Sequence, residues 1–335
     1  MQKVLFVCNY KPGVGGISGQ VEALHSHLKE EGIFADIFST RGNAFQRLLK
    51  PFQLYHIAQK YDILHIHCCS GWGFLPAVIG ISVGRCLKKR LVLTYHGGDA
   101  ENFFHKHHRI VKHYLSRTNS NIVLSGFLAK VFDKYDLPYT IIPNVIELDT
   151  SHYRERKHLL PKYICTRSHE DIYDIPCILR AFQRVQVQFP EASLTLVGDG
   201  TLHDTLIRQV KEMELKNVTF TGRVSNKEIY NYLDNADVFI SASTVDNMPV
   251  SLLEAMNAGL LVIASDIGGV PYLIVNGKTG LLFQAGNDNA LVNCMEQLIT
   301  HPEKGLSMAK EANSNLSIYS WEIVKKKLIP LYEQG

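Results

Sequence analysis

Two rounds of alternating apolar runs and amphipathic patterns fill the 335 residues, and this alternation limits the possible folds more than any other feature. Apolar residues at helical spacing, at positions 21, 24 and 28 and again within 76–87, predict helices in the first round. Strands that alternate with helices build parallel sheets covered on both faces. The predicted strands of this round are residues 3–8, 33–39, 62–67, 90–95, 121–125 and 140–142.

The second round begins after residues 143–159, where the pattern is lost and charged residues gather. A chain of this length suits two domains of ordinary size. We expect a Rossmann-like domain at 1–150, a second at 158–318, and a helical segment at 319–335 that packs back toward the first and is ended or bent by Pro330. Strands are predicted at 161–166, 193–197, 218–221, 238–241, 261–264 and 281–283, and helices at 175–189, 202–215, 227–235, 250–258 and 290–299.

Composition narrows the class of protein. With 46% hydrophobic and 20% charged residues, the chain is typical of a soluble globular protein rather than a disordered one. No apolar run reaches the roughly 18 residues of a membrane span, and the first residues lack a signal-peptide pattern. We expect a cytoplasmic protein, with peripheral contact at the inner membrane face as an option. The seven cysteines contain no Cys-x-x-Cys and predict no zinc site.

Charge is uneven along the chain. The first 150 residues hold 17 Lys and Arg against 11 Asp and Glu, and the remainder hold 18 against 21. The basic first half suits an anionic partner, and a solvated surface without a partner accounts for it almost as well. No nucleic-acid partner is expected.

A glycine-rich turn at residues 13–19 joins the first predicted strand to the first helix. Glycines such as Gly15 and Gly16 let backbone N–H groups approach a phosphate at the positive end of a helix. Ser18 interrupts the Gly-x-Gly-x-x-Gly pattern of dinucleotide sites, so a nicotinamide-dependent dehydrogenase is only a third hypothesis. A plain tight turn is the structural alternative.

Residues 243–259 carry the strongest chemical signal. A predicted strand ends at Ser241, a loop carries Asp246, and a helix begins near Pro249 or Val250. Backbone amides of the loop would then point past the strand end toward an anion, while the Glu254 carboxylate accepts two hydroxyls of a ribose. In the alternative, Asp246 caps the helix and Glu254 is a buried acid.

Seven motifs in order resemble the retaining glycosyltransferases of family 4, which have the two-domain GT-B fold. The resemblance covers most of the chain and implies two doubly wound Rossmann-like domains facing a central cleft. The motifs are Gly15-Gly16, Tyr95-His96-Gly97-Gly98-Asp99, Ile142-Pro143-Asn144-Val145, Val197-Gly198-Asp199-Gly200, Thr221-Gly222-Arg223, Asp246 with Glu254, and Ser265-Asp266-Ile267-Gly268-Gly269.

The resemblance also implies roles for particular residues. His96 would contact the transferred sugar, Arg167 would neutralise the diphosphate leaving group, and Asp246 would bind sugar hydroxyls. Glu254 would hold the nucleotide ribose. The remaining donor-binding residues would be Gly15, Gly16, Asn247, Met248, Pro249 and Val250.

The implied reaction moves a sugar from a nucleotide-diphosphate donor to a hydroxyl of a glycan or lipid-linked acceptor, with retention of configuration, in surface polysaccharide or glycoconjugate biosynthesis. No metal or other cofactor is expected, because the chain lacks an Asp-x-Asp motif. Positive groups and oriented donors would instead stabilise the leaving oxygen.

Two departures from the family pattern support a second hypothesis. Asp246 stands where the family has glutamate, and Ile172 stands where a lysine follows the arginine by five residues. His169, Arg223 or backbone amides would have to stabilise the diphosphate in place of the missing lysine. The alternative is a catalytically weak GT-B protein that binds a sugar nucleotide or partners an active glycosyltransferase.

Four histidines between positions 105 and 113 follow Phe103 and Phe104. Their spacing matches no common zinc pattern, and Lys106 and Arg109 would repel a cation. We interpret the stretch as a basic, aromatic surface loop that touches a membrane or a lipid-linked acceptor, or as an exposed loop without a partner.

Overall fold

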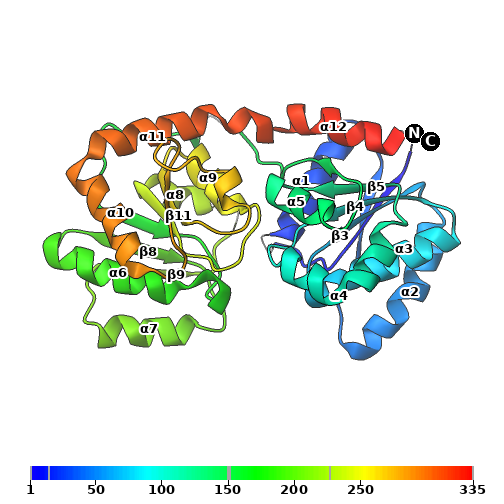
Figure 1. Cartoon of the computed structure of the whole chain (residues 1–335), viewed down its shortest axis with the longest axis horizontal. Coiled ribbons are helices and arrows are strands. Elements are labelled where there is room, and N and C mark those ends of the chain that lie inside the picture. The colour runs from blue at the N-terminus through cyan, green and yellow to red at the C-terminus, as the bar shows by residue number, and fades with distance from the viewer. Residues whose placement is uncertain (1, 14–15, 149–151, 226–227, 334–335) are drawn as a thin grey trace. The chain divides into compact units, whose positions relative to one another are not determined.

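Two parallel six-stranded sheets, each covered by helices, organise the chain in the computed structural model (Figure 1). The structure describes residues 2–13, 16–148, 152–225 and 228–333. One unit comprises Met1–Glu147 with Ile318–Gly335, and the other comprises Leu148–Ser317. The α/β class with two doubly wound sheets is confirmed.

The sheet of the first unit has the strand order β2-β1-β3-β4-β5-β6, with every neighbouring pair parallel. The chain moves from β1 to β2 on one side and then crosses to β3 on the other, so the winding reverses between β1 and β3. Its strands are β1 Val4–Cys8, β2 Ala35–Ser39, β3 Ile63–Cys68, β4 Arg90–Tyr95, β5 Ser120–Val123 and β6 Thr140–Ile141. Its helices are α1 Ile17–Glu30, α2 Ala44–Ala58, α3 Leu75–Cys86, α4 Ala100–Leu115, α5 Gly126–Asp133 and α12 Trp321–Glu333, with a 3-10 turn η1 at Gly71–Phe74.

Helix α12 packs on this first sheet. Trp321, Val324 and Leu328 are buried in one cluster with Phe6 of β1 and Ile122 of β5. Pro330 does not end the last segment, since α12 continues through it to Glu333. Proline removes one backbone donor, and the burial of the helix face offsets that loss.

The sheet of the second unit has the order β12-β11-β10-β7-β8-β9. Here the winding reverses between β7 and β10. Its strands are β7 Lys162–Cys165, β8 Ser193–Val197, β9 Val218–Gly222, β10 Val238–Ser241, β11 Leu261–Ser265 and β12 Leu281–Phe283. Its helices are α6 Ile175–Gln188, α7 His203–Glu212, α8 Ile229–Asp234, α9 Val250–Asn257, α10 Asp288–Thr300 and α11 Pro302–Ser314, with 3-10 turns η3 at Asp171–Tyr173, η4 at Val270–Tyr272 and η5 at Leu316–Tyr319.

The predicted surface loop at residues 103–113 is wrong. The stretch belongs to helix α4, in which Phe104 is fully buried and packs against Tyr95 and Phe132. His105 and Lys106 are exposed on the other side. An amphipathic helix places its aromatic residues in the core and its basic residues in water, so no aromatic surface forms here.

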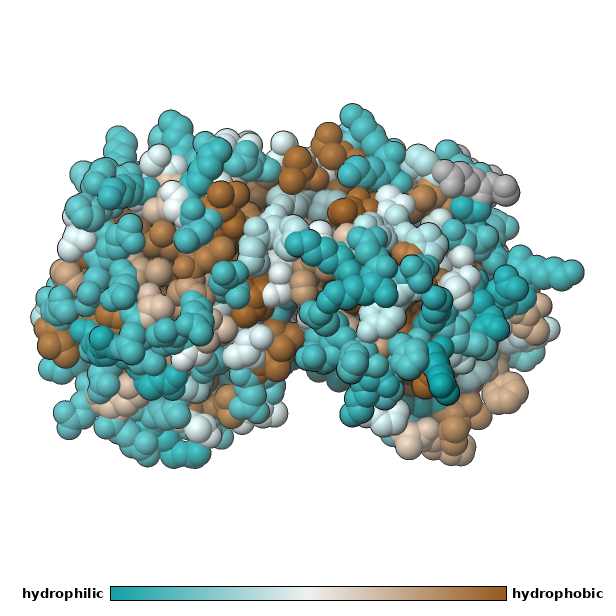
Figure 2. All heavy atoms as spheres, viewed as in Figure 1, coloured by the Kyte–Doolittle hydropathy of each residue, from teal (hydrophilic) through white to brown (hydrophobic). Residues whose placement is uncertain are grey.

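Helix α2 was not predicted, because Pro51 interrupts its pattern. A capping box fixes its start: the Asn43 side chain accepts from Gln46 N at 2.9 Å, and the Gln46 side chain accepts from Asn43 N at 3.0 Å. Figure 2 shows hydrophobic side chains gathered at the lower right, where Figure 1 places α2.

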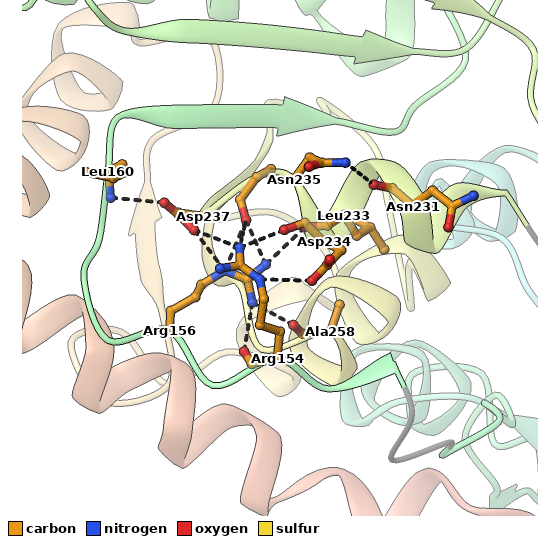
Figure 3. A network of polar contacts seen from close by, with 10 residues as sticks. Arg154, Arg156, Leu160, Asn231, Leu233, Asp234, Asn235, Asp237 and Ala258 are labelled. Carbon is orange, nitrogen blue, oxygen red and sulfur yellow. Dashed lines mark hydrogen bonds and ion pairs between the residues drawn. The ribbon is translucent and has the colours of Figure 1, made fainter.

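Arg154 and Arg156 bind backbone carbonyls at the C-terminal ends of α8 and α9 in the second unit (Figure 3). The side chain of Arg156 is buried and donates to the carbonyl oxygens of Leu233, Ala236 and Ala258, which terminate α8 and α9. It also contacts the buried Asp237 carboxylate at 3.1 Å. Helix C-termini present unpaired carbonyls, and Arg156 satisfies those of two helices at once.

Of the helices in the described part of the chain, none combines the length and the hydropathy that a bilayer-spanning segment requires.

Candidate functional site

The carboxyl ends of β7 and β10 meet where the second sheet reverses its winding, which is where open α/β sheets bind ligands. Arg167 follows β7 by two residues, and Asp246 lies in the loop between β10 and α9. The topology therefore brings together two residues that are 79 positions apart in the sequence.

Arg167 and Asp246 form an ion pair between a guanidinium Nη2 and a carboxylate Oδ2, with both side chains largely buried. Arg167 Nη1 also donates to Ser251 Oγ at 2.8 Å, and its guanidinium lies 4.2 Å from the centre of the Tyr173 ring. Arg167 Nε is buried without a partner among the described residues. The arginine is thus fixed on several sides and retains one unused donor.

The Arg167 guanidinium is charged at every accessible pH. Burial on its own would lower the pKa of Arg167, but Asp246 and Tyr173 outweigh it and raise that pKa. Asp246 neutralises part of this charge, and its second oxygen accepts from Asn247 N at 2.9 Å. A carboxylate has about four lone-pair sites, so Asp246 can still accept from a sugar hydroxyl.

Helix α9 begins at Val250, with the extended Pro249 as its first flanking residue. Asp246 lies three residues earlier and does not cap the helix, so the prediction that it is the capping residue is wrong. The first N–H groups of a helix lack acceptors inside it and attract anions. Asn247 and Met248 are buried in the preceding loop. A Cβ on Gly269 would lie 2.0 Å from Asn247 O, so only glycine allows this approach.

Glu254 is half-buried one turn inside α9, on the same helix as Ser251. Burial raises the pKa of its carboxyl to about 7, and nearby Arg167 acts in the opposite direction. Near neutral pH this group therefore exists in both protonation states, which is unusual for a glutamate.

His169 does not supply the missing positive charge. It is fully buried, its Nδ1 lies 2.9 Å from Nδ1 of His203, and burial together with His203 lowers its pKa. Its ring is consequently neutral at pH 7. Arg223 is exposed after β9, and Ile172 in η3 is 46% exposed.

Two acids near Arg167 have structural roles. Glu170 accepts from Thr201 N at 3.1 Å and from its hydroxyl at 2.6 Å, and Asp174 caps α6 by accepting from Cys177 N at 3.2 Å. A Cβ on Gly198 would lie 2.4 Å from Arg167 O. The Gly198-Asp199-Gly200 turn thus packs directly on the backbone that carries Arg167.

His96 follows β4 in the first unit, beside a small cavity of about 20 Å³ that His65, His67 and Asn144 also line. His96 Nε2 lies 2.9 Å from His67 Nδ1, and burial lowers the pKa of His96 to about 3. One imidazole nitrogen must therefore donate and the other accept, both rings being neutral.

His65 belongs to a second hydrogen-bonded group behind this pair. Its Nδ1 lies 2.7 Å from the Tyr332 hydroxyl and its Nε2 lies 2.8 Å from the Thr94 hydroxyl. The rings of His65 and His67 have centres 4.4 Å apart. Histidine is thus accommodated on the fully buried β3 because polar partners and neutral rings remove the cost of burial.

The glycine turn is only partly described. Gly16 directly precedes α1 and has φ 68°, a left-handed conformation that favours glycine. A Cβ there would meet no atom within 4 Å, so the space beside it is open. Gly15 lies outside the described residues.

Sequence reasoning missed three side-chain contacts of these sites, those made by Ser251, Tyr173 and His67, although it placed the backbone amide of Ser251 at the start of the helix. Ser251 and Tyr173 hold Arg167, and His67 holds His96. The one available signal was two histidines at alternate positions of an otherwise apolar strand. No group of three or more His, Cys, Asp or Glu side chains within the described ranges is arranged to hold a metal ion.

Two family models match the chain. The model of glycosyl transferases group 1 matches residues 170–315, and the model of glycosyltransferase family 4 matches residues 41–150. Together they cover about three quarters of the chain. The first match contains Asp246, Ser251 and Glu254 but not Arg167, and the second contains His96.

Curated relatives are similar over different lengths. The alpha-monoglucosyldiacylglycerol synthase of Streptococcus pneumoniae is 26% identical, with 89% of this chain and 78% of the relative covered. The sulfoquinovosyl transferase SQD2 of Arabidopsis thaliana is 29% identical, with 45% of this chain and 29% of the relative covered. The chain thus spans less than a third of that relative's length.

Among solved structures, Anabaena Alr3699/HepE in complex with UDP and glucose has a TM-score of 0.82 at 17% identity, with both chains covered completely. At this identity the likeness shows the fold, which is GT-B.

Proposed function

The chain belongs to glycosyltransferase family 4, and from that premise we propose that it transfers a sugar from a nucleotide-diphosphate donor to a hydroxyl acceptor with retention of configuration. The observation that carries the proposal is the rigidly held Arg167 at the β7–β10 reversal, beside the start of α9. Breaking the anomeric bond develops negative charge on the leaving diphosphate, and fixed positive groups stabilise it.

We propose the donor contacts residue by residue, as the family resemblance implies them. The α9 N-terminus and Arg167 would hold the phosphates, Glu254 the ribose and Asp246 a sugar hydroxyl. His96 would contact the transferred sugar, and Gly15 and Gly16 would approach the diphosphate. The sequence suggests no second carboxylate that would act as a nucleophile on the other face of the sugar. We therefore propose that the leaving phosphate itself takes the proton from the acceptor hydroxyl. We propose that this chemistry needs no metal.

The relatives guide the choice of substrates. HepE was crystallised with UDP and glucose, and the pneumococcal relative is named for a glucosyldiacylglycerol. We therefore propose a nucleotide sugar such as a UDP-hexose as donor and a lipid-linked or glycan hydroxyl as acceptor. A thermal-shift panel of UDP and GDP sugars tests the donor, with NAD as the negative control. Stabilisation by NAD and by no nucleotide sugar would refute the proposal.

Donor binding is expected to strengthen as pH rises from 6 to 8. The pKa of Glu254 is raised to about 7, so its carboxylate fraction increases over this window. Ribose hydroxyls donate more strongly to a carboxylate than to a protonated acid, so donor binding favours the ionised Glu254 and is coupled at pH 6 to the release of a proton. Calorimetry should show roughly tenfold tighter UDP-sugar binding at pH 8 than at pH 6.

The Glu254→Gln variant is the control for that experiment. It keeps the size of the side chain but cannot ionise, so its affinity should be weaker and independent of pH. An unchanged pH dependence in Glu254→Gln would assign the titration to another group.

His67 is expected to act as a positioning residue for His96, because it fixes one ring nitrogen at 2.9 Å. His67→Leu should lower kcat about tenfold and leave the donor Kd nearly unchanged. His67→Asn can still donate and accept, so it should restore part of kcat. His25→Asn, at a half-buried histidine of α1 whose Nε2 lies 3.0 Å from Ala35 O, is the matched control. Equal losses in His67→Leu and His67→Asn would argue for a merely structural role.

One observation favours a second candidate function, a sugar-nucleotide-binding protein with weak catalysis. Arg167 is paired with Asp246, His169 is neutral, and Ile172 takes the place of a lysine. The positive charge available to a diphosphate is therefore small. Tight donor binding with neither hydrolysis nor transfer, with and without EDTA, would establish this candidate in place of the first.

A further inference from the structure

The outward face of α2 is apolar, although the helix already buries its other face. Leu54 and Ala58 are fully buried in the core of the first unit. On the opposite side of the helix, Phe45, Leu48 and Phe52 are 70%, 72% and 70% exposed. Their spacing of three and four residues puts them on one stripe. Leu49 and Tyr55 are also exposed beside this stripe.

The two cations of this helix do not lie on its outward face. Arg47 and Lys50 are only half-exposed on its inner flank, and the Lys50 ammonium lies 5.3 Å from the Phe38 ring centre. A solvated helix places such cations outward and phenylalanines inward. Single exposed hydrophobic residues are ordinary, whereas a contiguous stripe marks an interaction surface.

The sequence on both sides of the stripe is predominantly positively charged. Between residues 37 and 98 the sequence holds eight Lys and Arg and one acid, Asp62. Helices α2 and α3 pack together, and Lys89 after α3 donates to Gln59 O at 3.1 Å, next to the end of α2. Arg85, Lys88 and Lys60 are exposed nearby in the sequence. Lys89 and Lys60 thus lie beside the C-terminal end of the helix that carries the apolar stripe.

We propose that this face of α2 binds the surface of a bilayer that contains anionic lipid. Apolar side chains would enter the acyl region while the flanking Lys and Arg contact headgroup phosphates, as interfacial helices do. The capping box keeps the helix formed before it meets lipid, so binding requires no folding step. The surface lies in the first unit and makes no use of Arg167 or Glu254. It deepens the proposed function by naming the phase in which a lipid-linked acceptor would be met.

The test uses the full chain and two kinds of vesicle, one of phosphatidylcholine alone and one that also contains roughly 30 mol% phosphatidylglycerol. The second kind carries the negative surface charge that attracts basic segments. The protein should sediment with the anionic vesicles, less with neutral ones, and less again as salt rises. The Leu48→Ser/Phe52→Ser variant should bind at least tenfold more weakly. A matched control, Val187→Ser/Val275→Ser, removes two exposed apolar residues of the second unit and should bind like the parent.

Three results would overturn the proposal. These are equal binding of both double variants, binding that ignores lipid charge, or a concentration-dependent dimer that Leu48→Ser/Phe52→Ser abolishes while vesicles are not bound. The stripe would in the last case serve a second copy of the chain.

Donor binding in solution separates this proposal from the proposed function. Leu48→Ser/Phe52→Ser should keep the parent's melting temperature and UDP-sugar affinity. Failure of every variant to bind a nucleotide sugar would refute the transferase proposal and leave vesicle binding standing.

Discussion

Arg167→Ala should reduce sugar transfer by about 10²- to 10³-fold, the range found when a fixed donor to a developing anion is removed. The structure gives the reason: Arg167 is held by Asp246, Ser251 and Tyr173 before any donor arrives. Turnover with saturating donor measures the effect, and it should fall more than donor affinity does.

Two variants separate lost catalysis from lost structure. Arg167→Ala leaves the largely buried Asp246 without its partner, which costs stability on its own. In Arg167→Gln/Asp246→Asn no charge is left unpaired, and transfer should still be lost. Arg180→Ala, at a half-exposed ion pair of the same unit, should behave like the parent. Transfer within about threefold of the parent in Arg167→Ala would contradict the site assignment.

Arg156→Ala should have the largest effect on stability, lowering the free energy of unfolding of the second unit by about 3–5 kcal/mol. The substitution removes one of the two arginines that pair with the buried Asp237 carboxylate, together with the buried hydrogen bonds to the carbonyls at the ends of α8 and α9 (Figure 3). With a urea dependence of about 1–3 kcal/mol per molar, the midpoint should fall by at least about 1 M.

The two tryptophans allow the units to be followed separately. Trp72 and Trp321 both belong to the first unit, so tryptophan fluorescence reports that unit and far-UV circular dichroism reports both. The midpoint should move in the dichroism signal and stay in the fluorescence. Arg154→Ala is the matched control, since its side chain is 43% exposed and its loss should cost much less. Equal shifts in the two variants would refute the role given to burial.

The sequence predicted the strands well because buried parallel strands are short, apolar and bounded by turns. It failed for helices whose pattern is broken. Pro51 hides α2, and the apolar stripe of Phe45, Leu48 and Phe52 faces away from the core, so no single buried face could be recognised. In α4 the histidines masked the periodicity that buries Phe104.

The candidate site could be predicted only where a motif fixes backbone geometry. The approach of the β7 and β10 loops brings Arg167 to Asp246, as the motif positions imply. Partners chosen by packing could not be foreseen: Ser251 and Tyr173 for Arg167, or His203 for His169. Likewise, the elevated pKa of Glu254 depends on burial, which spacing does not encode.

Helix α12 has a consequence for biosynthesis. The first sheet leaves the ribosome early, but the helix that covers Phe6 and Ile122 is translated only after residues 148–317. At ordinary elongation rates this face of the nascent sheet therefore has α1 but lacks α12 for on the order of ten seconds. A chain that terminates near residue 317 would leave the apolar surface that α12 covers exposed to water, and we expect it to aggregate more readily than the full chain.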